Sequence, residues 1–185
     1  TKEINAIFWL MKDPCIPPIV KINDPVLAST LGATLATKRT SAERLAKGVD
    51  PNALVFEPYA NPFRTYPLSN DYLKFKSLFE RGVDCYILNT GHFMDVKVQA
   101  SDTLSLIEAL AEKKKDIFKP LFGSSKIEYA TTSVVPLPEE KSWQHNFISQ
   151  LDKRVVYINS LNARNKLPDE TKDSIHKLIS EIKAV

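Results

Sequence analysis

Apolar and polar positions along the chain fall into blocks that predict strands and helices in alternation. Short apolar runs of strand length lie at residues 5–11 (NAIFWLM) and 83–88, and a third candidate strand lies at 126–131. Helical periodicity separates these runs in the first two thirds of the chain and dominates the remainder. This pattern predicts an α/β lobe with a mixed sheet, followed by a helical C-terminal tail.

Capping residues indicate where the helices begin and end. Asp24 precedes Pro25, a typical helix start, because the Asp side chain accepts from free backbone N–H groups and proline is tolerated in the first turn. We expect that helix to run to Lys38. Gly82 is predicted to end the helix of residues 69–81. Further helices are predicted over 101–116, over 139–162 with a candidate break near Arg154, and over 169–183.

The segment of residues 49–67 contains several prolines and is called the proline-punctuated segment. It is too apolar and aromatic for a solvent-exposed linker, and its prolines argue against a regular central strand. Its aromatic residues, Phe56, Tyr59, Phe63 and Tyr66, are predicted to belong to the core. The alternative is that these rings form an interaction surface.

Composition and charge describe an ordinary globular chain. Its 185 residues fit a single lobe, with 43% hydrophobic and 25% charged residues. The net charge of +3 does not favour nucleic acid, and the lysine run at 113–115 is expected to be a solvated helix end. No apolar run approaches the roughly 20 residues of a membrane span, and the first residues do not resemble a signal peptide. We therefore expect a soluble, cytoplasmic protein without a membrane or nucleic-acid partner.

Several kinds of site are excluded by spacing. The five glycines form neither a phosphate loop nor a dinucleotide fingerprint, and no nucleophile elbow is present. The three histidines lack partners at metal-ligand spacing, so we assign no metal ligand and no catalytic residue within this chain. Cys15 and Cys85 fit no zinc or redox motif and are expected to be buried free thiols.

The most suggestive local feature is the turn that follows the strand of residues 83–88. In open α/β sheets, ligands favour the carboxyl ends of strands, so Asn89 and His92 are candidate cleft residues. Arg64, in the proline-punctuated segment, is a third candidate for the same cleft. Gly91 is expected to adopt a backbone conformation that other residues resist.

Four segments, read in order, resemble the C-terminal lobe of ATP-dependent phosphoenolpyruvate carboxykinase. They are AIFWLMKD with IPPIVKI, LATKRTSAERLAKGVDP, LVFEPYANPF, and CYILNTG with DTLSLIEAL. Their order and spacing match that family over roughly residues 6–110, and the similarity becomes loose beyond about residue 125. The resemblance divides the single lobe into a carboxykinase-like part, 1–125, and a mainly helical tail, 126–185.

The resemblance implies a lobe that closes over a bound nucleotide and is inactive alone. The phosphate loop and the metal ligands would come from an N-terminal lobe of the parent chain, which would bind ATP with Mg or Mn. Arg44 takes the place of an arginine that contacts the nucleotide, and an arginine suits this task because its planar guanidinium can stack on a base or reach a phosphate. Asn52 stands where the family has a threonine near the nucleotide, and Lys97 is in register with a family lysine.

Departures from the family pattern leave a second reading open. Leu45 replaces the glycine that follows the family arginine, and Ala42 replaces the threonine before the Glu-Arg pair. The stretch after Gly91, residues 92–97, has lost the family glycines. The first reading is a lobe that serves ATP-dependent phosphoryl transfer coupled to decarboxylation. The alternative is a divergent, non-catalytic carboxykinase-like domain that acts in regulation or protein interaction.

Overall fold

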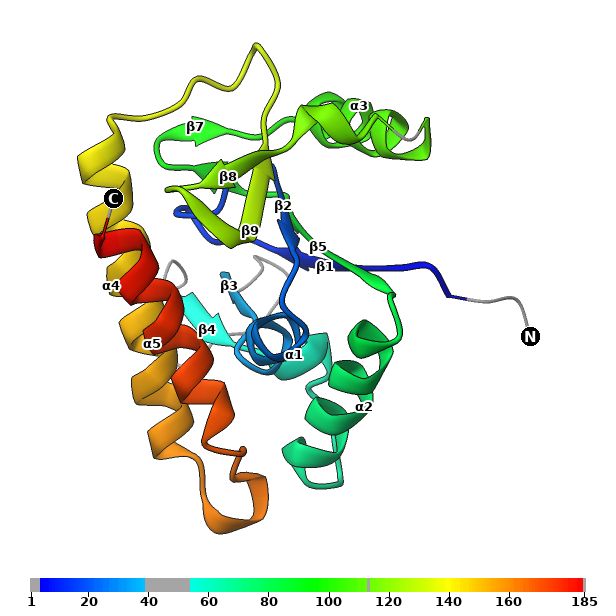
Figure 1. The fold of residues 1–185 in the computed structure, drawn as a ribbon, viewed down its shortest axis with the longest axis vertical. Helices are drawn as coiled ribbons and strands as arrows, with labels where there is room; N and C mark the ends of the chain where they lie inside the picture. Colours follow the sequence, from blue (N-terminus) through cyan, green and yellow to red (C-terminus); the bar gives the residue numbers. More distant parts are fainter. Residues whose placement is uncertain (1–3, 39–53, 113, 185) are drawn as a thin grey trace, which may run out of the picture.

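A five-stranded mixed sheet forms the centre of the protein (Figure 1). The computed structural model describes residues 4–38, 54–112 and 114–184 of the 185-residue chain. In spatial order the strands are β1 (Ala6–Met11), β5 (Asp84–Asn89), β2 (Ile19–Ile22), β9 (Ser124–Ala130) and β8 (Lys119–Leu121). β1 and β5 run parallel, and the other neighbouring pairs are antiparallel.

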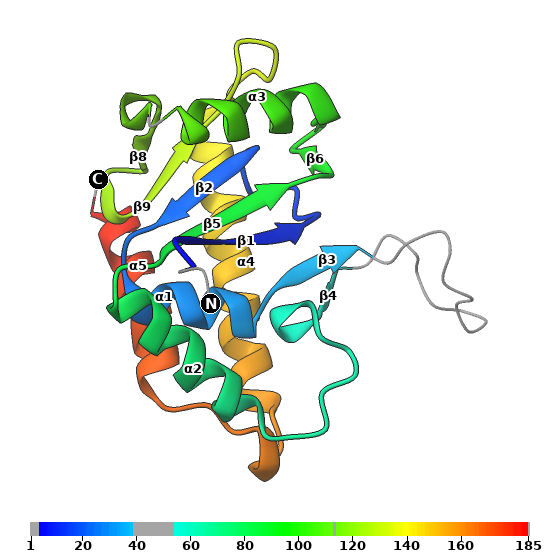
Figure 2. The same ribbon diagram turned by 90° about the vertical axis from the view of Figure 1, so that its right-hand side faces the viewer.

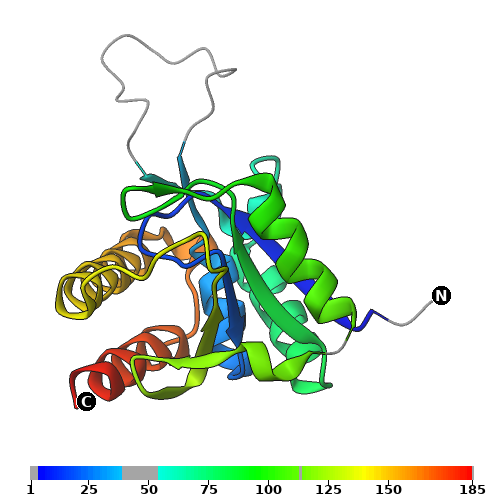
Figure 3. The ribbon, with the colours of Figure 1, turned by 90° about the horizontal axis from the view of Figure 1, so that it is seen from above.

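Five α-helices surround this sheet in the described part of the chain, and they form two layers (Figure 3). α3 covers one face, where Leu106 packs with Ile19, Tyr86 and Leu88. The neighbouring strand positions Val20 and Ile87 point to the other face, as the period of two requires, and join the main core there. The helices are α1 (Pro25–Ala33), α2 (Leu68–Glu80), α3 (Ala100–Ala111), α4 (Glu140–Ser160) and α5 (Glu170–Lys183).

The last two helices are part of the body of the lobe. α4 and α5 lie side by side and α5 also packs against α1. Their apolar residues, among them Trp143, Phe147 and Ile175, are buried in the main core. In the part of the chain that the structure describes, no helix combines the length and the apolar character needed to cross a membrane.

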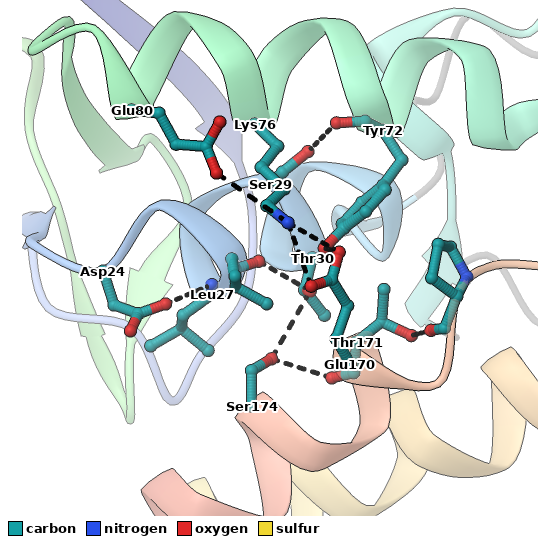
Figure 4. A network of polar contacts seen from close by, with 12 residues as sticks. Asp24, Leu27, Ser29, Thr30, Tyr72, Lys76, Glu80, Glu170, Thr171 and Ser174 are labelled. Atoms are coloured by element: carbon teal, nitrogen blue, oxygen red, sulfur yellow. Dashed lines mark hydrogen bonds and ion pairs between the residues drawn. The ribbon is translucent and has the colours of Figure 1, made fainter.

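Polar contacts between α1, α2 and α5 join the helical layer (Figure 4). Tyr72 Oη donates to Glu170 Oε1 over 2.7 Å, and Lys76 Nζ donates to both carboxylate oxygens of Glu170 over 2.9 Å. The Ser29 hydroxyl donates to Tyr72 O over 2.7 Å. The hydrogen bonds from Tyr72 and Lys76 lower the pKa of Glu170, since they favour its charged form.

Two small hairpins and three short 3-10 helices complete the fold within the residues that the structure describes. One hairpin joins β3 (Ala36–Lys38) to β4 (Leu54–Phe56), and the other joins β6 (His92–Phe93) to β7 (Val96–Lys97). The 3-10 helices are η1 (Pro58–Ala60), η2 (Lys115–Ile117) and η3 (Ala163–Asn165).

The α/β class and the mixed sheet agree with the sequence prediction, and several boundaries do too. α2 ends one residue before Arg81, and Gly82 follows with φ of 89°, a left-handed conformation that suits glycine. Asp24 caps α1 as expected, because its Oδ1 accepts from Leu27 N over 2.7 Å. The predicted break in α4 at Arg154 is wrong, since that helix continues to Ser160.

Other predictions fail where tertiary pairing overrides local pattern. α1 ends at Ala33 and not at Lys38, because residues 36–38 pair with β4 as strand β3. β2 was not predicted, although it is central in the sheet. Of the four aromatic residues in the proline-punctuated segment, Tyr59 is buried, but Phe63 is 87% exposed and Tyr66 is 39% exposed, so the core prediction is wrong for those two.

Candidate functional site

The parallel pair β1 and β5 brings two chain segments to one edge of the sheet. Met11 lies opposite Asn89 in the register, so both strands end at the same level. Figure 2 shows both arrows pointing toward the side that carries the β3–β4 and β6–β7 hairpins. This is the carboxyl edge at which α/β sheets bind ligands.

Asn89 fixes the turn at this edge with its side-chain amide. Nδ2 donates to Asp13 O over 2.9 Å, to Ile16 O over 2.6 Å and to His92 O over 2.8 Å. Oδ1 accepts from Gly91 N over 2.9 Å. The side chain is fully buried, so two N–H protons are shared among three carbonyl groups and both sides of the amide are bonded. Asn89 therefore ties the segment after β1 to the segment after β5 and acts as part of the framework.

A buried ion pair joins the same turn to α4. Arg154 Nη2 lies 3.0 Å from Asp13 Oδ2, and the two side chains are 2% and 0% exposed. Asp13 Oδ1 accepts from Cys15 N over 3.0 Å, and Trp143 Nε1 of α4 donates to Cys15 O over 2.9 Å. Two positions of α4 thus hold the segment that follows β1.

Gly91 is required for close approach and not for an unusual backbone angle. A Cβ at this position would lie 3.1 Å from Lys12 Cβ and 3.2 Å from Lys12 Cα. The prediction of a conformation that other residues resist is wrong, because Gly91 is not among the described glycines with positive φ. A side chain at this position would require the segment at Lys12 to move by a few tenths of an ångström.

A pocket of about 510 Å³ lies beside the end of β1. Strand alternation places Leu35 and Thr37 on one face of the hairpin, and Val55 with Glu57 on the same face of the opposing segment. Glu57 N donates to Leu35 O over 2.8 Å, which extends the pairing beyond β4. The lining residues are Leu10, Leu35, Thr37, Val55, Glu57, Ala60 and Pro62.

Among the described residues, the wall of this pocket is mostly apolar, with Thr37 and Glu57 as its polar members. Such a composition is typical of small-molecule sites, in which a few polar groups orient the ligand. Phe56 points to the opposite face of the hairpin and stacks on Tyr157 of α4, with ring centroids 4.5 Å apart. That stack attaches the hairpin to the helical layer.

Apart from Asn89, the predicted site residues fall into three groups: those outside the described residues, those on the β6–β7 hairpin, and Arg64. Arg44, Leu45 and Asn52 lie outside the described residues, in the segment that joins β3 to β4 along the sequence. His92 and Lys97 are paired across the β6–β7 hairpin and are both exposed. Lys97 Nζ lies 3.5 Å from Thr90 O, a weak contact with the turn.

Arg64 is half-buried, and its charge acts on Tyr157, whose ring stacks on Phe56 of the β3–β4 hairpin. Burial raises the pKa of Tyr157, Arg64 opposes this shift and Glu57 reinforces it. Both charges therefore lie within electrostatic range of the ring that stacks on Phe56. Neither Arg64, His92 nor Lys97 is among the residues that line the pocket.

The cysteines are free and buried, as the sequence predicted. Burial raises the pKa of Cys15 and of Cys85 to about 12, because the thiolate is poorly solvated in the core. Neither is suited to nucleophilic chemistry at neutral pH. Among the described residues, no group of three or more His, Cys, Asp or Glu side chains is arranged to hold a metal ion.

Sequence reasoning missed Asp13, Arg154 and Glu57. Arg154 carried one signal: it interrupts the apolar stripe formed by Phe147, Leu151 and Ile158, which is an unusual place for an unpaired charge.

A search among protein-family models and among curated protein sequences found no match to this chain.

Proposed function

We propose that this lobe closes over a nucleoside triphosphate in a phosphoenolpyruvate carboxykinase-like protein. The resemblance implies ATP, bound with Mg or Mn, and a reaction that couples phosphoryl transfer to decarboxylation of a dicarboxylic keto acid. The proposed location is the cytoplasm. The lobe is inactive alone in this proposal, because an N-terminal lobe of the parent chain supplies the phosphate loop and the metal ligands.

One observation supports the proposal above all others. The pocket of about 510 Å³ is lined by β3 and β4, the two strands that flank the segment carrying Arg44 and Asn52. That segment matches the family motif for nucleotide contact, and its two anchoring strands border a largely apolar cavity at the carboxyl edge. The resemblance therefore assigns the nucleotide to the stretch of sequence between the two strands that border this cavity.

Different groups of residues would contact different parts of the nucleotide. The apolar walls would hold the base, and Arg44 would stack on it or reach a phosphate with its guanidinium. Lys97 belongs to the β6–β7 hairpin, which lies at the same edge (Figure 2), and it would add positive charge for the phosphates. Phosphoryl transfer depends on positioning and on cations that stabilise the moving charge, so a lobe can contribute without holding the phosphate loop.

Titration calorimetry of Mg-ATP into the full-length protein tests the proposal. Arg44→Ala is expected to weaken binding at least about tenfold, the scale expected for a lost charged hydrogen bond. Arg81→Ala is the matched control, because Arg81 is exposed at the far end of β5 from the site. Unchanged affinity in Arg44→Ala would remove this residue from the site, and no binding of any nucleotide would overturn the proposal.

The non-catalytic alternative is favoured by one observation. Phe63 is 87% exposed in the segment that follows the pocket, which is unusual for a large aromatic side chain. In that case the lobe would keep its fold and present this segment to a protein partner. Loss of partner binding in Phe63→Ser, with nucleotide binding absent, would support this alternative.

A further inference from the structure

β1 is one of the two outer strands of the sheet, so only one of its sides is paired with another described strand (Figure 2). Its partner is β5, and the side that faces away from β5 is called the free edge. The other outer strand is β8, which has three residues, includes Pro120 and is irregularly paired. β1 has six residues and no proline, so its free edge is the longer and more regular of the two.

Hydrogen bonds at the two ends of the β1–β5 pair show which residues of β1 turn their main-chain groups to the free edge. Asp84 N donates to Asn5 O over 2.9 Å, and Thr90 N donates to Met11 O over 2.9 Å. Both acceptors are odd-numbered, and successive residues of a strand direct their N–H and C=O groups to opposite sides. The residues whose N–H and C=O groups point to the free edge are therefore Ala6, Phe8 and Leu10. Among the described residues, none of these groups has a hydrogen-bond partner.

β1 has none of the features that normally protect an outer strand against pairing. Proteins place charged side chains, prolines or bulges on such strands, whereas the sequence of β1 is AIFWLM. Apolar side chains also remain exposed along it, since Leu10 and Ile4, shortly before the strand, are each 60% exposed. A long, apolar strand with free main-chain groups is a template for another strand. The free edge therefore has the chemistry of a docking site for an extended, apolar segment.

The proposed function indicates which segment this is. It gives the phosphate loop and the metal ligands to an N-terminal lobe, which must therefore reach the sheet edge where β1 and β5 end. β1 is the outermost described strand on that side, and Met11 at its end lies opposite Asn89 of the turn. We propose that an extended segment of the N-terminal lobe pairs with the free edge of β1 and continues the sheet into that lobe. This inference rests on the proposed function.

The free edge sets requirements for the segment that pairs with it. Ala6, Phe8 and Leu10 offer three donors and three acceptors, so the segment needs main-chain N–H groups opposite them and no proline at those positions. Because β1 pairs with β5 over six residues, this docking fixes the N-terminal lobe to the two strands that end at the Asn89 turn. The β3–β4 hairpin forms a separate sheet and takes no part in the pairing.

Residue-resolved amide hydrogen exchange of the full-length protein, without nucleotide, tests the pairing. Ile7 and Trp9 direct their N–H groups to β5 and serve as internal controls, because they are protected whether or not the free edge is paired. We expect the amides of Phe8 and Leu10 to exchange within about tenfold of these controls, as amides of one cooperative unit do. Exchange of Phe8 and Leu10 at the rate of an unstructured peptide, beside slow exchange of the controls, would overturn the proposal.

Two substitutions at Leu10 test whether the protection comes from hydrogen bonds at the free edge. Leu10→Pro removes the N–H group at the free edge and leaves the bonds of Trp9 and Met11 to β5, whereas Leu10→Ala shortens the side chain and keeps the N–H. We expect Phe8 to exchange at least about tenfold faster in Leu10→Pro than in Leu10→Ala, because the neighbouring pair is lost. Slow exchange of Trp9 checks that β1 is still paired with β5. Equal exchange of Phe8 in the two variants would contradict the pairing.

Photo-cross-linking identifies the segment at the free edge. The photoreactive amino acid benzoylphenylalanine replaces Leu10, whose side chain is 60% exposed, and mass spectrometry identifies the peptides that become linked to it in the full-length protein. We expect a peptide of the N-terminal lobe, linked within one molecule. Two linked molecules would assign the free edge to a second copy, and linked peptides from residues 1–185 alone would assign it to this lobe itself. Either result overturns the proposal.

These outcomes are separable from those of the proposed function, because titration of Mg-ATP into the same protein measures nucleotide binding independently. Protected Phe8 and Leu10 with a cross-link to the N-terminal lobe, in a protein that binds no nucleotide, would support the docking and overturn the proposed function. Unprotected amides in a protein that binds Mg-ATP would overturn the docking alone.

Discussion

The turn at Asn89 and the β3–β4 hairpin lie at the same edge of the sheet but are built in opposite ways. The turn is buried and held by Asn89, by the pair of Asp13 and Arg154, and by close contact at Gly91. The hairpin consists of three residue pairs and is attached to α4 by the stack of Phe56 on Tyr157.

This difference shows how one edge of the sheet can have a rigid part beside a part that shifts more easily. A buried, hydrogen-bonded turn resists rearrangement, because a different arrangement would break these bonds and leave buried polar groups unpaired. A short hairpin with half-buried residues can shift at lower cost, since less packing must be broken. We infer that the turn is the fixed frame and that the hairpin is the part that responds to a ligand.

The largest expected effect is on the turn. Arg154→Ala removes one member of a fully buried ion pair and leaves the Asp13 carboxylate uncompensated. We expect a loss of about 3–5 kcal/mol in the free energy of unfolding, measured by urea denaturation. Lys153→Ala, one residue away and exposed, is the control and should change stability by less than about 0.5 kcal/mol. Equal stability of the two variants would mean that the buried pair does not hold the turn.

A smaller effect is expected at the closest approach within the turn. In Gly91→Ala the new methyl group would meet Lys12 at 3.1 Å, which forces the segment after β1 to move. We expect a destabilisation of about 1–3 kcal/mol, the usual cost of overpacking. Thermal melting measures it, with Gly82→Asn as a comparison, because Asn tolerates the left-handed conformation of Gly82 and has open space around it. A neutral Gly91→Ala would show that the turn can yield.

The hairpin should respond more weakly in stability and more strongly in binding. Tyr157→Leu removes the stack on Phe56 and should cost about 0.5–1.5 kcal/mol in unfolding free energy beyond the lost area. Nucleotide affinity of the full-length protein should fall as well, since Phe56 lies between Val55 and Glu57 of the pocket wall. If Tyr157→Leu alters stability but leaves affinity unchanged, the hairpin is not the responsive part.

The smallest effect is expected at the contact of α2 with α5, which belongs to neither the turn nor the hairpin and serves as a reference for both. The hydrogen bonds from Tyr72 and Lys76 lower the pKa of Glu170, so their contribution to stability is complete above the ordinary pKa of a glutamate, 4.5, and is lost as the pH falls through the lowered value. As the pH falls below about 4.5, Glu170→Gln should lose less unfolding free energy than the unchanged protein. The difference should be less than about 1 kcal/mol. Urea midpoints between pH 3 and pH 7 measure this, with Glu108→Gln as control. An unchanged pH profile would show that the contact is immaterial.

The sequence predicted best those features that depend on local chemistry. The cap at Asp24, the helix stop at Gly82 and the burial of the two cysteines follow from the residues themselves. β2 escaped prediction because four residues after Pro17 and Pro18 show no period of their own, and their strand conformation comes from two neighbours in the sheet.

The candidate site shows the same limit. Asn89 was identified because it follows a strand, but its partners Asp13 and Ile16 come from another part of the chain. Arg154 lies 141 residues from Asp13, so nothing local reveals their pairing. Glu57 is placed in a pocket by its pairing with Leu35, a contact that the expected helix of residues 25–38 excluded.

The central claim is that the hairpin responds to a nucleotide while the turn remains fixed. Amide hydrogen exchange of the full-length protein, with and without Mg-ATP at saturating concentration, tests it directly. The account predicts that the amides of β3 (Ala36–Lys38) and β4 (Leu54–Phe56) gain protection with the nucleotide, and that peptides covering 13–16 and 89–92 are protected already and do not change. Protection that appears at the turn and not at the hairpin, or at neither, would contradict the account.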